Sequence, residues 1–241
     1  MKKFFKIVGI TLLAVSLVGV VMKFGFEKPT KKTDKEYTEM TYVAFGDSIT
    51  YGVDGITGER ATTPYPSLVG DMLELKNVTN KGVSGATLSN VTGRTNMTEE
   101  ILNFEGKADI ISVMLGVNDY TAGVPLGNES SKTNTSVYGS LYLIAEHLSE
   151  NYSDSFVFFM TPYPTKTGET KNSAGYTLED VATAVKDVAE EFDIPVLDMY
   201  ENGEYETEMN KEESDGVHPS ETFFKKYTAP QIVYFLKANL D

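Results

Sequence analysis

Residues 41–50 read TYVAFGDSIT, a short apolar run that passes directly into Gly46-Asp47-Ser48. A run of this length, rich in aromatic and β-branched residues and followed by Gly and Asp, is typical of a strand that ends in a turn. Further runs of this kind follow at residues 78–83, 109–115, 156–161 and 195–199. The run at residues 78–83 shows the strand pattern least clearly. The sequence therefore predicts five short strands.

Longer segments between these runs carry apolar residues three and four positions apart, which indicates helices. They cover residues 65–75, 136–149, 178–192 and 221–240. Strands that alternate with helices favour parallel βαβ units, with helices packed on both faces of one sheet. The carboxyl ends of the strands then lie at one edge, where ligands bind in such sheets.

The composition narrows the classes of function. A chain of 241 residues suits one α/β domain with a full hydrophobic core. The formal net charge of −14 repels phosphate backbones, so nucleic acid is not expected as a partner. Because the chain has no cysteine and only two histidines, neither a cysteine nucleophile nor a zinc site is expected.

Residues 1–26 have the pattern of a signal peptide or N-terminal membrane anchor. Lysines near the start precede an apolar run over residues 7–22. No clear cleavage site follows, which favours the anchor. The basic amino-terminal side is expected to stay in the cytoplasm, so the domain over residues 41–241 would lie on the outer face of the membrane or be secreted. Membrane contact is expected only through residues 4–26, and the polar residues 27–40 are expected to form a linker.

Polar groups follow the first three strands. Ser48 comes directly after the first strand, although Gly-Asp-Ser alone is also an ordinary turn or helix cap. The second strand ends in NKGVSG, which contains Gly82, and the third ends in GVND, which contains Asn118. A backbone N–H at Gly82 and the side-chain amide of Asn118, both near a serine, are donors of the kind that a tetrahedral oxyanion needs.

A further motif, DGVHP, precedes the C-terminal helix and contains Asp215 and His218. An aspartate and a histidine three positions apart on a tight turn can hydrogen-bond through their side chains. The carboxylate then fixes the tautomer of the imidazole. A lone histidine before proline is more often a surface residue. The other histidine, His147, lies within a helical segment and is expected to be a helix surface or groove residue.

Taken together and in order, these motifs resemble the sequence blocks of the SGNH (GDSL-type) hydrolase family. The residues that carry the resemblance are Ser48, Gly82, Asn118, Asp215 and His218. Each block is short, but four blocks in the right order, in a matching context of strands and helices, are specific. The resemblance covers residues 41–241. It implies a flavodoxin-like three-layer α/β/α sandwich with a mostly five-stranded parallel sheet.

The resemblance also implies a serine esterase that needs neither a cofactor nor a metal. His218 would take the proton of Ser48, which attacks an ester carbonyl, and Asp215 would orient the imidazole. The oxyanion would be bound by the backbone N–H groups of Ser48 and Gly82 and by the amide of Asn118.

The sequence is compatible with more than one class of ester substrate. Small acyl esters, including O-acetyl groups on glycans, are the leading expectation. The domain is expected outside the cell, and its loops over residues 52–63 and 121–134 are polar rather than apolar. A lipase or thioesterase is an alternative. An O-acyltransferase acting on cell-surface glycans is another, since hydrolysis and transfer share an acyl-enzyme. A non-catalytic binding module is least expected, because no site residue is missing.

Overall fold

The computed structural model describes residues 35–201, 205, 208, 211 and 213–241. The signal peptide or anchor expected over residues 1–26 lies outside the described residues. Within the described part of the chain, no helix is long and apolar enough to cross a membrane.

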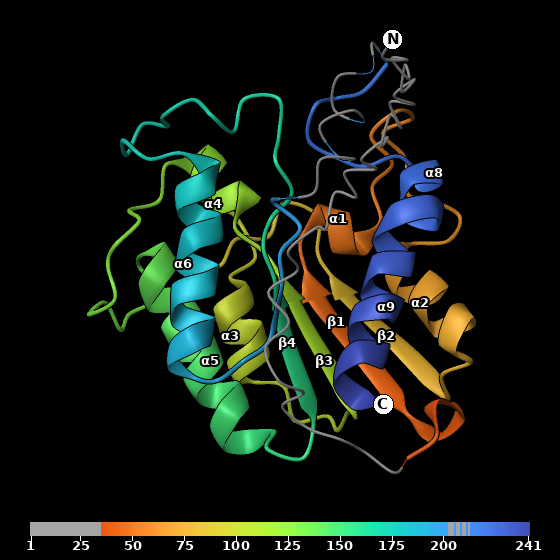
Figure 1. Cartoon of the computed structure of the whole chain (residues 1–241). Coiled ribbons are helices and arrows are strands. Elements are labelled where there is room, and N and C mark those ends of the chain that lie inside the picture. The colour runs from red at the N-terminus through yellow and green to blue at the C-terminus, as the bar shows by residue number, and fades with distance from the viewer. Residues whose placement is uncertain (1–34, 202–204, 206–207, 209–210, 212) are drawn as a thin grey trace, which may run out of the picture.

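A five-stranded, fully parallel sheet forms the centre of the fold (Figure 1). Its spatial order is β2-β1-β3-β4-β5. Gly46, at the end of β1, pairs with Gly82 of β2 and with Met114 of β3, so these three strands end level with one another. The segments that follow them therefore start at one edge of the sheet. The strands are β1 (Thr41–Gly46), β2 (Asn77–Gly82), β3 (Ile110–Met114), β4 (Phe156–Met160) and β5 (Val196–Leu197).

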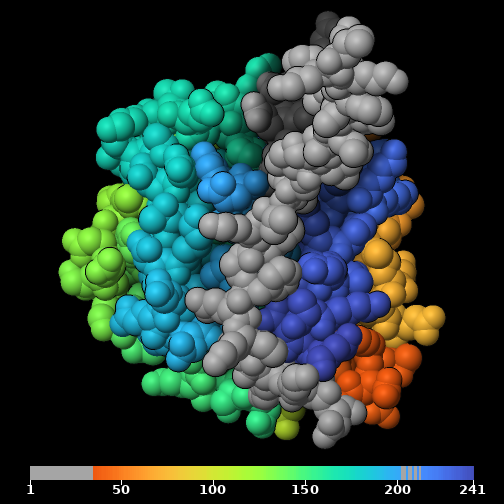
Figure 2. Space-filling model, in the orientation of Figure 1, coloured from red at the N-terminus to blue at the C-terminus, as the bar shows by residue number. Residues whose placement is uncertain are grey.

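Helices cover both faces of the sheet, as the alternation of strands and helices predicts (Figure 1). On one face, α2 (Tyr65–Leu73) packs against α9 (Ala229–Leu240). On the other, α5 (Val137–Asn151) packs against both α3 (Met97–Leu102) and α6 (Leu178–Glu191). Figure 2 shows that α6 and α9 both reach the molecular surface. Every residue of β3 is buried between these layers, which confirms the expected α/β/α sandwich.

The C-terminal helix expected over residues 221–240 is continuous but irregular. It begins as α8 (Glu221–Phe223), passes through a π-helical turn (Phe224–Thr228) and continues as α9. Pro230 lies in the first turn of α9. Proline has no N–H to donate, and its ring crowds the carbonyl four residues earlier. A wider helical turn just before it accommodates both effects.

The fifth strand is shorter than the expected range of residues 195–199. Only Val196–Leu197 pair with β4. The N–H groups of Met199 and Tyr200 donate instead to the hydroxyl of Thr161, at 2.7 and 2.9 Å. A side-chain acceptor therefore ends the strand, and the sequence pattern gives no sign of it.

The last residues of the segment expected as a linker contact the folded domain. Residues Tyr37–Glu39 form a short 3-10 turn, η1, and Met40 is buried in the core. The Lys35 ammonium forms an ion pair with Asp109 at 2.6 Å. The end of the segment expected as a linker, residues 27–40, is therefore packed against the domain.

Candidate active site

Two short helices begin at the carboxyl edge of the sheet, where β1 and β3 end (Figure 1). They are α1 (Ser48–Tyr51) and α4 (Val117–Ala122). With four and six residues, they are too short for an apolar period to reveal them in the sequence. They place Ser48 and Asn118 on defined backbone at the same edge.

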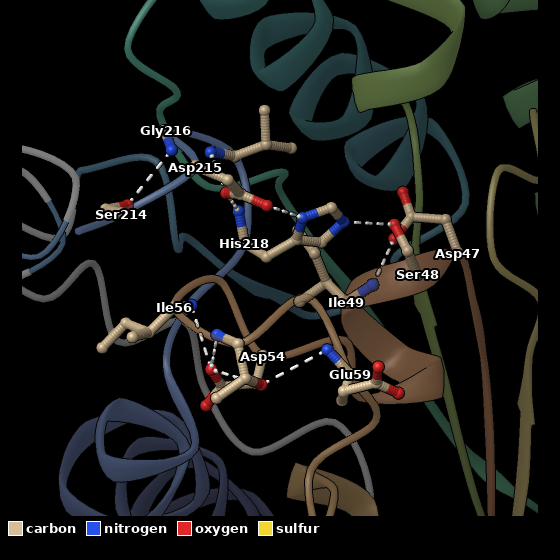
Figure 3. Close-up of polar contacts among 12 residues, drawn as sticks. Asp47, Ser48, Ile49, Asp54, Ile56, Glu59, Ser214, Asp215, Gly216 and His218 are labelled. Atoms are coloured by element: carbon tan, nitrogen blue, oxygen red, sulfur yellow. Dashed lines mark hydrogen bonds and ion pairs between the residues drawn. The ribbon is translucent and has the colours of Figure 1, made fainter.

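Ser48, His218 and Asp215 form a continuous chain of hydrogen bonds (Figure 3). Ser48 Oγ lies 2.8 Å from His218 Nε2, and His218 Nδ1 lies 2.6 Å from Asp215 Oδ2. Because an ionised carboxylate only accepts hydrogen bonds, Nδ1 carries the proton and Nε2 faces the serine hydroxyl as an acceptor. This is the tautomer that a general base requires. The structure thus brings together the three residues that the sequence singled out.

The Asp215 carboxylate is itself held by the backbone. Its Oδ1 accepts from the N–H groups of Val217 and His218, both at 2.8 Å, which leaves Oδ2 for the imidazole. Burial is the largest single influence and would raise the pKa of Asp215. The hydrogen bonds from His218 and Val217 together outweigh it and hold that pKa below its ordinary value. Asp215 is therefore ionised at neutral pH and can stabilise an imidazolium.

The loop that follows α1, which contains Asp54 and Ile56, lies beside the turn that carries His218 (Figure 3). The Gly55 N–H donates to the Pro219 carbonyl at 3.0 Å, and the Gly55 carbonyl accepts from the Asp215 N–H at 2.9 Å. The segment after the nucleophile is thus paired with both sides of the histidine turn. Backbone hydrogen bonds between these two segments therefore hold Ser48 and His218 in position relative to each other.

Asp54 joins the same loop to the start of α8 through hydrogen bonds, a role that no sequence motif indicates. Its carboxylate accepts from the N–H groups of Ile56, Thr57 and Glu221, at 2.9, 2.8 and 2.6 Å. Burial would raise the pKa of Asp54, but these hydrogen bonds hold it below its ordinary value. Glu221 is 167 positions away along the chain, so only the folded structure reveals the contact.

Asn118 is fixed by two different partners. Its Nδ2 donates to the Ala86 carbonyl at 2.9 Å, and its Oδ1 accepts from Arg94 Nη1 at 3.3 Å. A carbonyl and a guanidinium on opposite ends of the amide determine which end is the nitrogen. Since Nδ2 carries two hydrogens, one remains for a substrate oxygen.

The loop after β2 offers a different donor from the one expected. The Gly82 N–H donates to Asn80 Oδ1 at 2.8 Å, so this geometry does not support the oxyanion role expected for Gly82. Gly85 has a φ of +78° and is the third residue of a turn closed by the Ala86 N–H and the Val83 carbonyl at 3.0 Å. Positive φ at that position is typical of a type II turn, which favours glycine. No acceptor for the Gly85 N–H is found among the described residues, which makes Gly85 the candidate donor.

Two buried acids shape the backbone around these donors. Asp47 accepts from the Ile49 N–H at 2.9 Å and caps α1. Asp119 accepts from the N–H groups of Leu88 and Ser89, at 2.7 and 2.9 Å, and so ties α4 to the loop after β2. Burial raises the pKa of each acid to about 6, because these hydrogen bonds offset only part of the cost of desolvation.

Within the described ranges, no cluster of three acidic or histidine side chains is arranged to hold a metal ion. His147 is the other histidine of the chain and lies on α5. Its Nδ1 lies 3.3 Å from the Asn151 side chain, and its Nε2 is buried without a hydrogen-bond partner. This partly buried position fits the groove residue expected from the sequence.

Comparison with known proteins bears on both the fold and the family. The sequence model of the GDSL-like Lipase/Acylhydrolase family matches residues 44–224, a range that contains Ser48, Asp215 and His218. This chain belongs to that family. The match confirms the resemblance to the SGNH hydrolases and supports an ester hydrolase. The chain matches none of the curated proteins.

Solved bacterial structures share the fold. A Lactobacillus plantarum protein is similar with a TM-score of 0.69 and 23% identity, covering 84% of this chain and 99% of the other. A lipase/acylhydrolase from Enterococcus faecalis has a TM-score of 0.61 and 20% identity, with coverages of 84% and 97%. A carbohydrate acetylesterase family member from Sinorhizobium meliloti has a TM-score of 0.59 and 18% identity, with coverages of 83% and 99%. At these identities the likeness shows the fold alone.

The close approach at Gly55 leads to a first testable expectation. A Cβ at this position would lie 2.0 Å from the carbonyl oxygen of His218, so the histidine turn would have to move. We expect Gly55→Ala to lower the kcat of ester hydrolysis by about 100-fold, the scale of a 1 Å misplacement in a site.

The matched control lies in the same loop. Gly58 has a φ of +72° but meets nothing within 4 Å, so Gly58→Ala adds backbone strain without a collision. We expect Gly58→Ala to lose some stability and little activity, measured by thermal unfolding and steady-state kinetics. Equal kcat values for the two variants would contradict a supporting role for Gly55.

Proposed function

We propose that this chain is a serine carboxylic-ester hydrolase that acts on small acyl esters through an acyl-enzyme. The observation that carries the proposal is the hydrogen-bond chain from Ser48 through His218 to Asp215, at 2.8 and 2.6 Å. It lies at the carboxyl edge of a parallel sheet, where ligands bind in this class of fold.

In the proposed reaction, His218 Nε2 takes the Ser48 proton as Oγ attacks the ester carbonyl. Asp215 stabilises the imidazolium that forms. The oxyanion accepts hydrogen bonds from the N–H groups of Ser48 and Gly85 and from the amide of Asn118. The Ser48 N–H belongs to the first turn of α1, where such groups have no partner inside the helix. His218 then protonates the leaving alcohol, and water cleaves the acyl-enzyme by the same steps in reverse.

The distribution of apolar surface favours short acyl groups. Of the large apolar side chains exposed in the described part of the chain, Ile56 and Val83 lie on separate loops beside the site. Met72 and Tyr234 lie on the outer helices α2 and α9. Scattered side chains of this kind differ from the contiguous patch that binds a long acyl chain.

The natural substrates that we propose are O-acetyl groups on extracellular glycans. A carbohydrate acetylesterase family member shares the fold, so the scaffold is compatible with this substrate class. The export pattern of residues 1–26 supports a location on the outer face of the membrane or outside the cell.

A series of p-nitrophenyl esters tests the proposal on the purified full chain. We expect acetate and butyrate esters to exceed the decanoate ester in kcat/KM by ~10-fold or more, on the scale that a few methylene groups contribute in a pocket. An O-acetylated glycan should release acetate. A preference for decanoate would contradict the short-acyl proposal, and no turnover of any ester would contradict the hydrolase. Acetyl transfer to an added glycan in place of acetate release would identify an O-acyltransferase.

A further inference from the structure

The chain contains two arginines, Arg60 and Arg94, in a protein with a net charge of −14. Arg94 lies in the loop between β2 and α3 and is exposed. Its Nη1 donates to the Gly85 carbonyl at 3.0 Å and to Asn118 Oδ1 at 3.3 Å. One cationic group thus joins the two segments that carry candidate oxyanion donors.

The contact with Asn118 fixes the direction of an amide. A guanidinium offers only donors, so the amide must present Oδ1 to Arg94 and turn Nδ2 away from it. The Ala86 carbonyl on the other side accepts one Nδ2 hydrogen and favours the same orientation. A charged donor on Oδ1 also polarises the amide, which strengthens Nδ2 as a donor.

The contact with Gly85 acts on a backbone turn. The Gly85 carbonyl accepts from Arg94, and the N–H of the same residue is the candidate donor. Type I and type II β-turns differ in the orientation of their central peptide group. In the turn from Val83 to Ala86, that peptide group contains the Gly85 N–H. Holding the Gly85 carbonyl in place disfavours a rearrangement of the turn.

We propose that Arg94 is a positioning residue for the oxyanion hole, which orients the Asn118 amide and the Gly85 turn for the tetrahedral intermediate. The inference rests on the proposed function, because it concerns the donors of the same site. Arg94 acts through Asn118 and Gly85 and is assigned no contact with the reacting atoms. As an exposed side chain it adds little to stability, so its loss should appear in kcat.

Three variants of the full chain test the inference with p-nitrophenyl acetate. We expect Arg94→Met to lower kcat about 10-fold at nearly constant KM. This loss is smaller than the ~100-fold or greater loss expected when one oxyanion donor is removed, because the donors remain and only their orientation is weakened. Arg94→Lys should restore most of kcat, because an ammonium can donate to both oxygens. Arg60→Met is the matched control, since Arg60 is also exposed but donates to the Tyr51 carbonyl at 3.0 Å and lies over its ring.

A second readout needs no turnover. The side-chain amide signal of Asn118 in a ¹⁵N–¹H spectrum is identified by its loss in Asn118→Ala. We expect Arg94→Met to shift this signal and Arg60→Met to leave it in place.

If Arg94→Met keeps both the parent kcat and the parent amide signal, the inference about Arg94 is overturned, while the proposed esterase activity is unaffected. If the parent hydrolyses no ester, the proposed function fails first, and an unshifted amide signal still overturns the orienting role of Arg94.

Discussion

Replacing Ser48 by alanine is expected to lower kcat/KM for p-nitrophenyl acetate by about 10³-fold or more, because the variant has no nucleophile to form the acyl-enzyme. The fold should not change. The side chain that caps α1 belongs to Asp47, whose carboxylate accepts from the Ile49 N–H, and this cap does not depend on the Ser48 hydroxyl. Thermal unfolding of the variant should match that of the parent, so the loss is assigned to chemistry.

His218→Ala is expected to give a loss of similar size, and the double variant with Ser48→Ala should lose little more. The two groups act as a unit, so removing the second costs almost nothing once the first is gone. The chain supplies its own control, because its other histidine, His147, lies on α5 and hydrogen-bonds Asn151. His147→Ala should keep the parent kcat/KM. Residual activity near the parent level in Ser48→Ala would exclude Ser48 as the nucleophile.

The contacts that join Ser48, His218 and Asp215 depend on short-range geometry and on topology, which is why the sequence can suggest them. Asp215 and His218 are three residues apart, so one tight turn is enough to bring their side chains together. Ser48 is 170 positions from His218, yet it follows β1 directly. In a parallel sheet a residue at that place lies at the ligand-binding edge.

The backbone donor in the loop after β2 is harder to derive from the sequence. The motif NKGVSG contains two glycines, and a pattern of residues does not say which N–H remains unpaired. The side chain of Asn80 takes the Gly82 N–H, while the turn from Val83 to Ala86 leaves that of Gly85 without an acceptor among the described residues. Both results depend on side-chain rotation and turn type, which the alternation of apolar and polar residues does not encode.

Asp54 and Arg94 are beyond sequence reasoning for a different reason. The chain has 35 acidic residues, and nothing local distinguishes Asp54 from the others. Its partner Glu221 and the Arg94 partner Asn118 are brought near by crossovers of the sheet. A residue that supports the site through a partner far away in the sequence can be identified only from the folded structure, where the loops at the sheet edge lie next to each other.

Asn118→Ala is expected to reduce kcat by ~10²–10³-fold, because it removes a donor that is used when the oxyanion forms. A loss confined to the transition state lowers kcat and kcat/KM equally and leaves KM nearly unchanged. The substitution also breaks the hydrogen bond from Asn118 Nδ2 to the Ala86 carbonyl. Asn103→Ala is the matched control, since it also removes one bond from an Asn amide to a backbone carbonyl, that of Glu99 at 2.8 Å.

The backbone donor can be tested by replacing the amide N–H of one glycine with an ester oxygen, through incorporation of glycolic acid. At Gly85 this change should lower kcat by ~10²-fold, the scale of one lost oxyanion donor. At Gly82 it removes a hydrogen bond to Asn80, so we expect a loss of stability and a much smaller change in kcat. The reverse order of the two kcat values would return the donor role to Gly82. It would also require Asn80 to release that N–H when the substrate binds.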